Sequence, residues 1–153
     1  MTYNAPRVSK CAWLEYRQSS AQTISTGSII TFDTKRTTGG DSVSINSSTG
    51  VVSLSSSKRY WIQASISIER SSNADYEINW EQSDGTALAE ADGNFPAYNR
   101  LVTGVLGYPF YNSSFVASLM VNEPSVDYRL KVTTCPASST VLSWTHLFII
   151  ELE

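Results

Sequence analysis

The chain has 153 residues, a length typical of one domain around a single hydrophobic core. Its formal net charge of −3 supplies no positive field for a phosphate backbone, which argues against DNA or RNA as a partner. Hydrophobic residues make up 41% of the chain and charged residues 16%. This is enough apolar mass to form a core, so global disorder is excluded as well.

Apolar and polar residues alternate with period two along most of the chain, whereas helical spacing is repeatedly interrupted. In chain order we expect strands at 12–17, around Ile24, and at 28–32, 43–45, 51–54, 60–69, 76–82, 101–106, 114–121, 126–133 and 142–152. Residues 86–100 hold turn formers such as Gly93 and Pro96 and are expected to form a long surface connection. The pattern predicts an all-β protein, an antiparallel β-sandwich of jelly-roll topology.

The division of the chain is expected to be simple. Residues 12–153 form the jelly-roll domain, and residues 1–11 form an N-terminal arm without the apolar segment of a secretion signal. No stretch approaches the roughly 18 apolar residues of a membrane span, so we expect a soluble protein with no membrane partner. Cys11 and Cys135 are expected to lie far apart and reduced, and with one histidine they cannot complete a zinc site. No metal or cofactor is predicted.

The last predicted strand is apolar on both faces. One face carries Trp144, His146, Phe148, Ile150 and Leu152, and the opposite face carries Leu147 and Ile149. An antiparallel strand of this kind needs two covers, of which the second sheet of a sandwich supplies one. In so small a chain the other cover is expected to be a further copy of the protein. The residues predicted to lie in a subunit interface are therefore Trp144, His146, Leu147, Phe148, Ile149 and Ile150.

Two passages carry a resemblance to a known family. Residues 43–68 (VSINSSTGVVSLSSSKRYWIQASISI) give a strand, a Thr-Gly turn, a short strand, a polar gap and an alternating strand opened by an aromatic residue. Together with the final SWTHLFIIEL, this passage resembles the jelly-roll heads of the complement globular-head and tumour necrosis factor superfamily, including versions found in bacteriophage virion proteins. The resemblance implies a compact homotrimer in which the sheet holding the terminal strands faces the threefold axis. The chain differs from the secreted animal members in having no collagen stalk.

Candidate catalytic groups are few. The single histidine, His146, falls on an apolar strand face and is expected to be packed rather than catalytic. Glu77 and Glu81 form a carboxylate pair that could serve glycoside chemistry, and Glu90 with Asp92 form another in the long connection. Asp84 and the latter pair could join carbonyls around calcium, although no spaced acidic loop is present. We therefore expect no enzyme activity, and keep a small carbohydrate-active enzyme as an alternative.

Two further groups of residues are candidates for partner contacts. Aromatic residues lie in or beside predicted loops, where exposed rings suit glycan stacking and protein interfaces alike: Phe95, Tyr98, Tyr108, Phe110 and Tyr111. The arm contributes Tyr3, Pro6 and Arg7 as expected capsid contacts. The leading hypothesis is a non-enzymatic, trimeric virion protein on a bacteriophage capsid surface that decorates or cements the capsid or forms part of a head fibre, with the major capsid protein or another virion protein as partner. The first alternative is a receptor-binding tip that contacts a host surface glycan.

Overall fold

A computed structural model describes residues 12–69, 76–88, 95–96, 99–101, 112–135 and 138–152. The regular structure of these residues is all β, and among them there is no helix long and apolar enough to cross a membrane. The strands are β1 (Trp13–Arg17), β2 (Gln22–Ile24), β3 (Thr34–Gly39), β4 (Val43–Asn46), β5 (Val51–Leu54), β6 (Arg59–Glu69), β7 (Tyr76–Gln82), β8 (Phe95–Pro96), β9 (Asn99–Leu101), β10 (Asn112–Asn122), β11 (Tyr128–Thr134), β12 (Ser139–Val141) and β13 (His146–Leu152).

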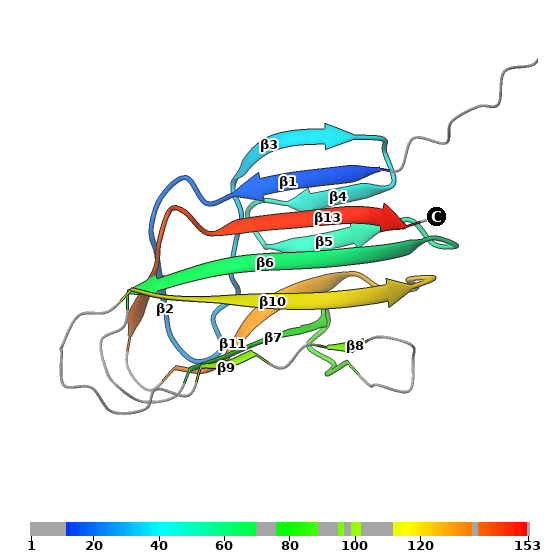
Figure 1. The fold of residues 1–153 in the computed structure, drawn as a ribbon. Coiled ribbons are helices and arrows are strands. Elements are labelled where there is room, and N and C mark those ends of the chain that lie inside the picture. The colour runs from blue at the N-terminus through cyan, green and yellow to red at the C-terminus, as the bar shows by residue number, and fades with distance from the viewer. Residues whose placement is uncertain are drawn as a thin grey trace, which may run out of the picture.

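The strands form two antiparallel sheets. Sheet A has the order β2-β12-β6-β13-β1-β3, in which β12 and β13 pair with successive parts of one edge of the long strand β6. The other edge of β6 pairs with β10, and β8 lies beside β10. Sheet B has the order β4-β5-β11-β7-β9. Figure 1 looks onto sheet A, in which the first and last strands, β1 and β13, are antiparallel neighbours. The predicted antiparallel β-sandwich of jelly-roll type is confirmed.

The core lies between the sheets and is built from the inward residues of alternating strands. In β6 these residues are Tyr60, Ile62, Ala64, Ile66 and Ile68, all fully buried. The polar ends of core aromatic rings have partners on the opposite sheet. The Tyr76 hydroxyl of β7 lies 2.8 Å from Ser139 Oγ of β12, and Trp80 Nε1 donates to the Ala117 carbonyl of β10 at 3.3 Å. Since a buried unpaired donor costs about 1–3 kcal/mol, these bonds make large aromatic residues compatible with the core.

The segment after β2 differs from the sequence prediction. Residues 28–32 were expected to be a strand, but only Ile29 makes a bridge, to Lys131 of β11. The segment does satisfy some backbone hydrogen-bonding groups along β11, because Ile30 N–H donates to the Leu130 carbonyl at 2.9 Å. The regular strand comes later, as β3, whose Thr-rich sequence has no apolar alternation and was missed for that reason.

The C-terminal region also differs. The last strand begins at His146 rather than at Leu142, because residues 142–145 form a turn closed by Thr145 N–H donating to the Leu142 carbonyl at 3.0 Å. The preceding polar segment forms β12, which the sequence analysis did not predict. Of the predicted strand at 101–106, only Leu101 is described, as the end of β9. The expected long connection at 86–100 contains β8 and the start of β9.

Candidate functional site: an uncovered apolar face

The two faces of β13 have different environments. Leu147 and Ile149 are fully buried and pack in the core between the sheets. Phe148 and Ile150 point to the opposite side, where no described element covers sheet A, and Phe148 is 40% exposed. The prediction of a strand that is apolar on both faces is therefore confirmed, but one of its two covers is the chain itself.

This uncovered side of sheet A continues across the neighbouring strands. The register places Trp13 of β1 and Trp61 of β6 on either side of Ile150, and Met120 of β10 beyond Trp61. We define the apolar face by six of the outward apolar residues of these four strands: Trp13, Trp61, Val116, Met120, Phe148 and Ile150. Trp13, Trp61, Val116, Met120 and Phe148 are between 37% and 43% exposed. Large apolar groups left in water together on one sheet face mark an interaction surface.

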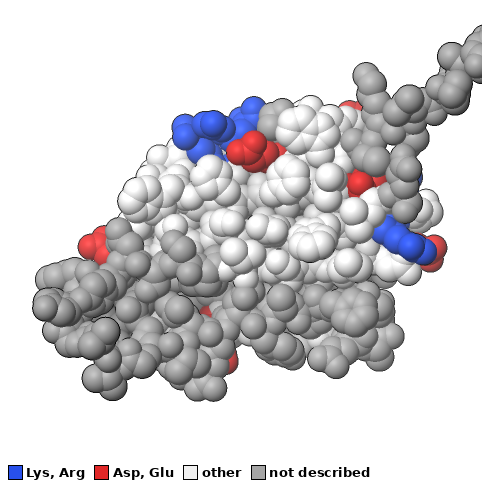
Figure 2. All heavy atoms as spheres, in the orientation of Figure 1, with Lys and Arg blue, Asp and Glu red and all other residues white. Residues whose placement is uncertain are grey.

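Charged side chains are sparse on this face. Figure 2 views sheet A from its outer side, and uncharged atoms occupy its middle, with blue atoms gathered towards the upper left. Lys35 and Arg36 of the edge strand β3 are exposed, consistent with the use of charge to protect an open sheet edge from pairing. The face is therefore apolar at its centre and charged at its border, which is the usual anatomy of a protein interface.

One titratable pair lies within the face. His146 Nδ1 of β13 is 3.8 Å from Glu15 Oε1 of β1, and both side chains are partly exposed. Arg17 lies opposite His146 in the β1–β13 register. Among the described residues, no hydroxyl or thiol forms a hydrogen bond with this imidazole, so His146 and Glu15 are not part of a catalytic triad there.

The surface of the apolar face is not flat. At one end the indole of Trp13 lies on Gly39 of β3, so closely that a Cβ on Gly39 would be 2.5 Å from Trp13 Nε1. At the other end there is a small hollow of about 150 Å³, lined by Trp61, Ser118, Leu119 and Met120. The face thus carries a partly exposed indole that lies over β3 and an apolar depression on different strands.

The predicted interface residues divide into three groups. His146, Phe148 and Ile150 do lie on the outer face of sheet A. Leu147 and Ile149 were wrongly assigned to a subunit interface, because both are fully buried within one chain. Trp144 is 58% exposed but lies on the turn before β13, so its predicted place on the strand is wrong as well.

The sequence analysis missed four residues of the face: Trp13, Trp61, Val116 and Met120. Each lies at an outward position of a strand whose other outward positions are mainly polar, so no single strand shows an apolar outer face. A signal was present, since tryptophan on the wet side of an alternating strand is unusual. Recognising the face required the strand order, because the four residues come from three strands far apart in the sequence.

The other predicted contact residues are mostly outside the described part of the chain. Tyr98, Tyr108, Phe110 and Tyr111 lie outside the described residues, as do Tyr3, Pro6, Arg7 and Cys11 of the arm. Phe95 lies in β8, whose backbone pairs with β10 at Met120. The glycan-contact and capsid-contact predictions therefore remain predictions.

The carboxylate pair on β7 does not form a glycosidase site. Glu81 is nearly buried and accepts from Arg129 Nε at 2.6 Å and from Lys131 Nζ at 3.1 Å. Glu77 accepts from the Thr134 hydroxyl at 3.1 Å. Four residues along one strand separate their Cα atoms by about 13 Å at roughly 3.3 Å per residue, and the two carboxylates bind different partners. Both geometries of glycoside hydrolysis need carboxyl groups within about 9.5 Å of each other.

The acidic groups proposed for calcium do not converge in the described residues. There, no group of three His, Cys, Asp or Glu side chains could hold a metal ion. Asp84 caps its own turn, and the backbone N–H of Thr86, 2.8 Å from Asp84 Oδ1, holds the pKa of this carboxyl below its usual value. Glu90 and Asp92 lie outside the described residues.

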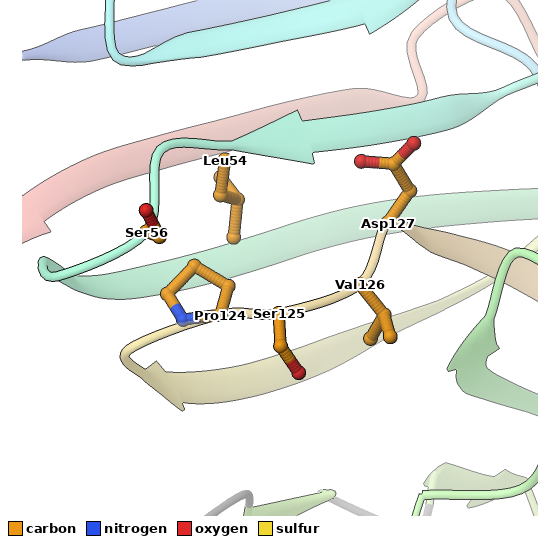
Figure 3. Close-up of a pocket in the computed structure, with 6 residues that line it drawn as sticks. All are labelled: Leu54, Ser56, Pro124, Ser125, Val126 and Asp127. Carbon is orange, nitrogen blue, oxygen red and sulfur yellow. The ribbon is translucent and has the colours of Figure 1, made fainter.

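A second depression of about 370 Å³ opens at one end of the inner strands of sheet B, between β5 and the loop that leads into β11. It forms where β5 and β11 diverge beyond their single pair, Val52 with Tyr128. Figure 3 shows its lining residues on the end of β5 and on the loop that leads into β11: Leu54, Ser56, Pro124, Ser125, Val126 and Asp127. It is open and mixed in character, and it lacks the convergent polar groups that orient a ligand in a binding site.

Comparison with known proteins identifies the fold. No family model and no curated protein matches the sequence. Among solved structures, the Eiger TNF of S. frugiperda is similar with a TM-score of 0.56 at 9% identity, over 94% of this chain and 92% of that one. Murine APRIL is similar with a TM-score of 0.57 at 9% identity, over 94% of this chain and 100% of that one. A weaker likeness, with a TM-score of 0.45 at 9% identity over 92% and 95% of the two chains, is to the PRD1 vertex protein P5. The chain thus has a TNF-like jelly-roll fold.

Proposed function

We propose that this chain is a non-enzymatic structural protein that assembles as a homotrimer through the apolar face of sheet A. The single observation that carries the proposal is that four strands place large apolar side chains together on a sheet face that no described element covers. A second copy of the chain is the simplest cover, because most soluble oligomers are closed homo-oligomers. The likeness in fold to TNF-type heads supports threefold rather than twofold closure.

The non-enzymatic part of the proposal is supported by what surrounds the candidate catalytic groups. Glu81 and Glu77 are engaged in hydrogen bonds within sheet B, and His146 lies on the apolar face beside Glu15. A group that holds a sheet together is not available to act on a substrate, because removing it from its partners costs stability. In the described residues no nucleophile, base and orienting group converge on one depression.

Within this class, the proposed place of the protein is a bacteriophage virion, on the capsid surface as a decoration or cementing protein or within a head fibre. The support is the resemblance of residues 43–68 and of the final SWTHLFIIEL to phage versions of the jelly-roll head. The proposed partner is the major capsid protein or another virion protein, contacted through residues 1–11. The low charge content of the chain fits a role in protein contacts better than one in nucleic-acid binding.

The oligomeric state is the first test. Native mass spectrometry and sedimentation of the purified chain should give about three times the 16.8 kDa of one chain. A folded monomer at micromolar concentration would refute the proposal. The virion role is tested separately by comparing purified particles with and without the protein. Particles that lack it should break open at lower temperature or lower salt, and particles of unchanged stability would rule out cementing.

A further inference from the structure

The apolar face contains one continuous row that runs across sheet A. Register pairs place Met120 beside Trp61, Trp61 beside Ile150, and Ile150 beside Trp13. Trp13 in turn is paired with Gly39. The row therefore crosses β10, β6, β13 and β1 without a charged or hydroxyl-bearing side chain. Beyond Met120 the backbone register continues to Phe95 of β8, and beyond Trp13 it ends on the bare backbone of β3.

The two ends of this row are complementary in shape. The indole of Trp13 lies on the bare backbone of Gly39, where no side chain competes for its place, and Trp13 is 37% exposed. The hollow at the other end has apolar walls and a volume of about 150 Å³, and an apolar cavity of roughly that size can hold a benzene-sized ring. The row carries a partly exposed indole at β1 and a fitting depression at β6 and β10.

A threefold ring needs this kind of pair. Its contacts are heterologous, so two different patches of one chain must fit each other, whereas a twofold contact uses the same patch twice. If the axis runs along the strands of sheet A, each transverse row meets the same row of the next subunit at the same height. One end of a row then faces the other end of its neighbour.

We infer that the indole of Trp13 in each subunit inserts into the hollow beside Trp61 and Met120 of the next subunit. The inference rests on the proposed trimer and specifies how its subunits engage. Burying the exposed part of an aromatic ring in a desolvated pocket is the usual source of most binding energy at an interface. It also fixes the direction of the ring, because indole and hollow cannot exchange places.

The neighbouring row provides a test that leaves the apolar row intact. It runs from Ser118 through Gln63 and Phe148 to Glu15, so the same arrangement brings Glu15 of one subunit near Ser118 of the next. Glu15→Cys and Ser118→Cys are combined in a Cys11→Ser chain and treated with a short bismaleimide. We expect covalent trimers on a denaturing gel, and only the monomer from either single cysteine variant. The control pair is Glu15→Cys with Ser44→Cys, an exposed position of sheet B, and should remain monomeric.

A second variant tests the indole without changing it. Gly39→Ala puts a methyl group 2.5 Å from Trp13 Nε1, so the ring must leave its position. We expect at least a tenfold weaker trimer with the same far-ultraviolet circular dichroism, whereas Thr38→Ala on the same edge strand should assemble normally.

The outcomes separate the two proposals. A trimer that links through the Glu15 and Ser118 cysteines supports both. A trimer that fails to link, that links through Glu15→Cys alone, or that is unaffected by Gly39→Ala overturns the Trp13 contact and leaves the trimer standing. A monomeric wild-type chain overturns both.

Discussion

Adjacent residues of β13 should respond to truncation in opposite ways. Leu147 is fully buried in the core, so Leu147→Ala is expected to destabilise the folded chain by about 2–5 kcal/mol, the usual cost of a core leucine truncation. Phe148 is on the outer face and 40% exposed in a single chain. Because its ring is only partly covered within the single chain, its truncation should lower the free energy of unfolding of the monomer by less than Leu147→Ala does.

The effect of Phe148→Ala should appear in assembly instead. A phenylalanine buries about 200 Å² in total, so 40% of it leaves about 80 Å² for a partner to cover. At about 25 cal/mol per Å² this is worth roughly 2 kcal/mol per copy, or about 6 kcal/mol for three copies. Because each 1.4 kcal/mol is about tenfold, the trimer association constant should fall by about four orders of magnitude if the ring is fully covered.

Sedimentation equilibrium over a concentration series measures assembly, and urea unfolding at concentrations below dissociation measures the monomer. Leu147→Ala should lower the urea midpoint strongly, and Phe148→Ala should shift the sedimentation isotherm while lowering the midpoint less than Leu147→Ala does. The reasoning is wrong if Phe148→Ala leaves assembly unchanged, or if both variants destabilise the monomer equally.

Three further predictions concern the sandwich itself. Glu151 accepts from Lys58 Nζ at 2.8 Å and from a serine hydroxyl, contacts that hold its pKa below the usual value. Its contribution is therefore present above the ordinary glutamate pKa of 4.5 and is lost as pH falls through the lowered pKa of the folded state, so the urea midpoints of wild type and Glu151→Gln should converge as pH falls below about 4.5. Glu81→Gln should cost about 1–3 kcal/mol in urea unfolding, because two cations lose a shared carboxylate; an unchanged midpoint would show that this network is only a surface feature. Gly50→Ala should lower the melting temperature much more than Gly27→Ala: both glycines have positive φ, but only the Gly50 methyl would meet a backbone carbonyl oxygen, at 2.5 Å. Equal decreases in melting temperature would mean that the positive φ alone, and not the contact with the carbonyl oxygen, determines the cost of the substitution.

Much of the fold could be predicted from alternation alone. The pattern of β6 and β7 sets inward isoleucines against outward polar residues, and both strands appear with nearly the predicted bounds. The prediction failed for strands that are defined by backbone hydrogen bonds to a neighbouring strand rather than by the burial of alternate side chains. β3 is paired with β1 along its length but carries threonine, lysine, arginine and glycine, so its hydrogen bonds leave no trace in hydropathy. β12 was missed for the same reason, because it is short and mainly polar and shows no apolar alternation.

The candidate site could be predicted only in part, because the apolar face combines residues from several strands, and only the order of the strands in sheet A brings these residues together. The sequence indicates that β13 is apolar on both sides, and it cannot say which side the chain covers. That choice depends on register: Ile149 faces Leu14 of β1 and Ile62 of β6, all of which point into the core. A shift of one residue would exchange the two sides of the strand.

The same register explains why the uncovered side is better suited to a partner than to the core. Its outward residues include Trp13 and Trp61, whose ring nitrogens need a polar partner or water, whereas the inward set of β13 is purely aliphatic apart from Glu151 at its end. An aliphatic face packs densely against a second sheet within one chain. An aromatic face with polar residues between its rings can be exposed in a monomer and then bury its rings on association. The division of β13 into these two chemistries is therefore what an assembling sandwich requires, and it is the feature that Phe148→Ala and Leu147→Ala separate.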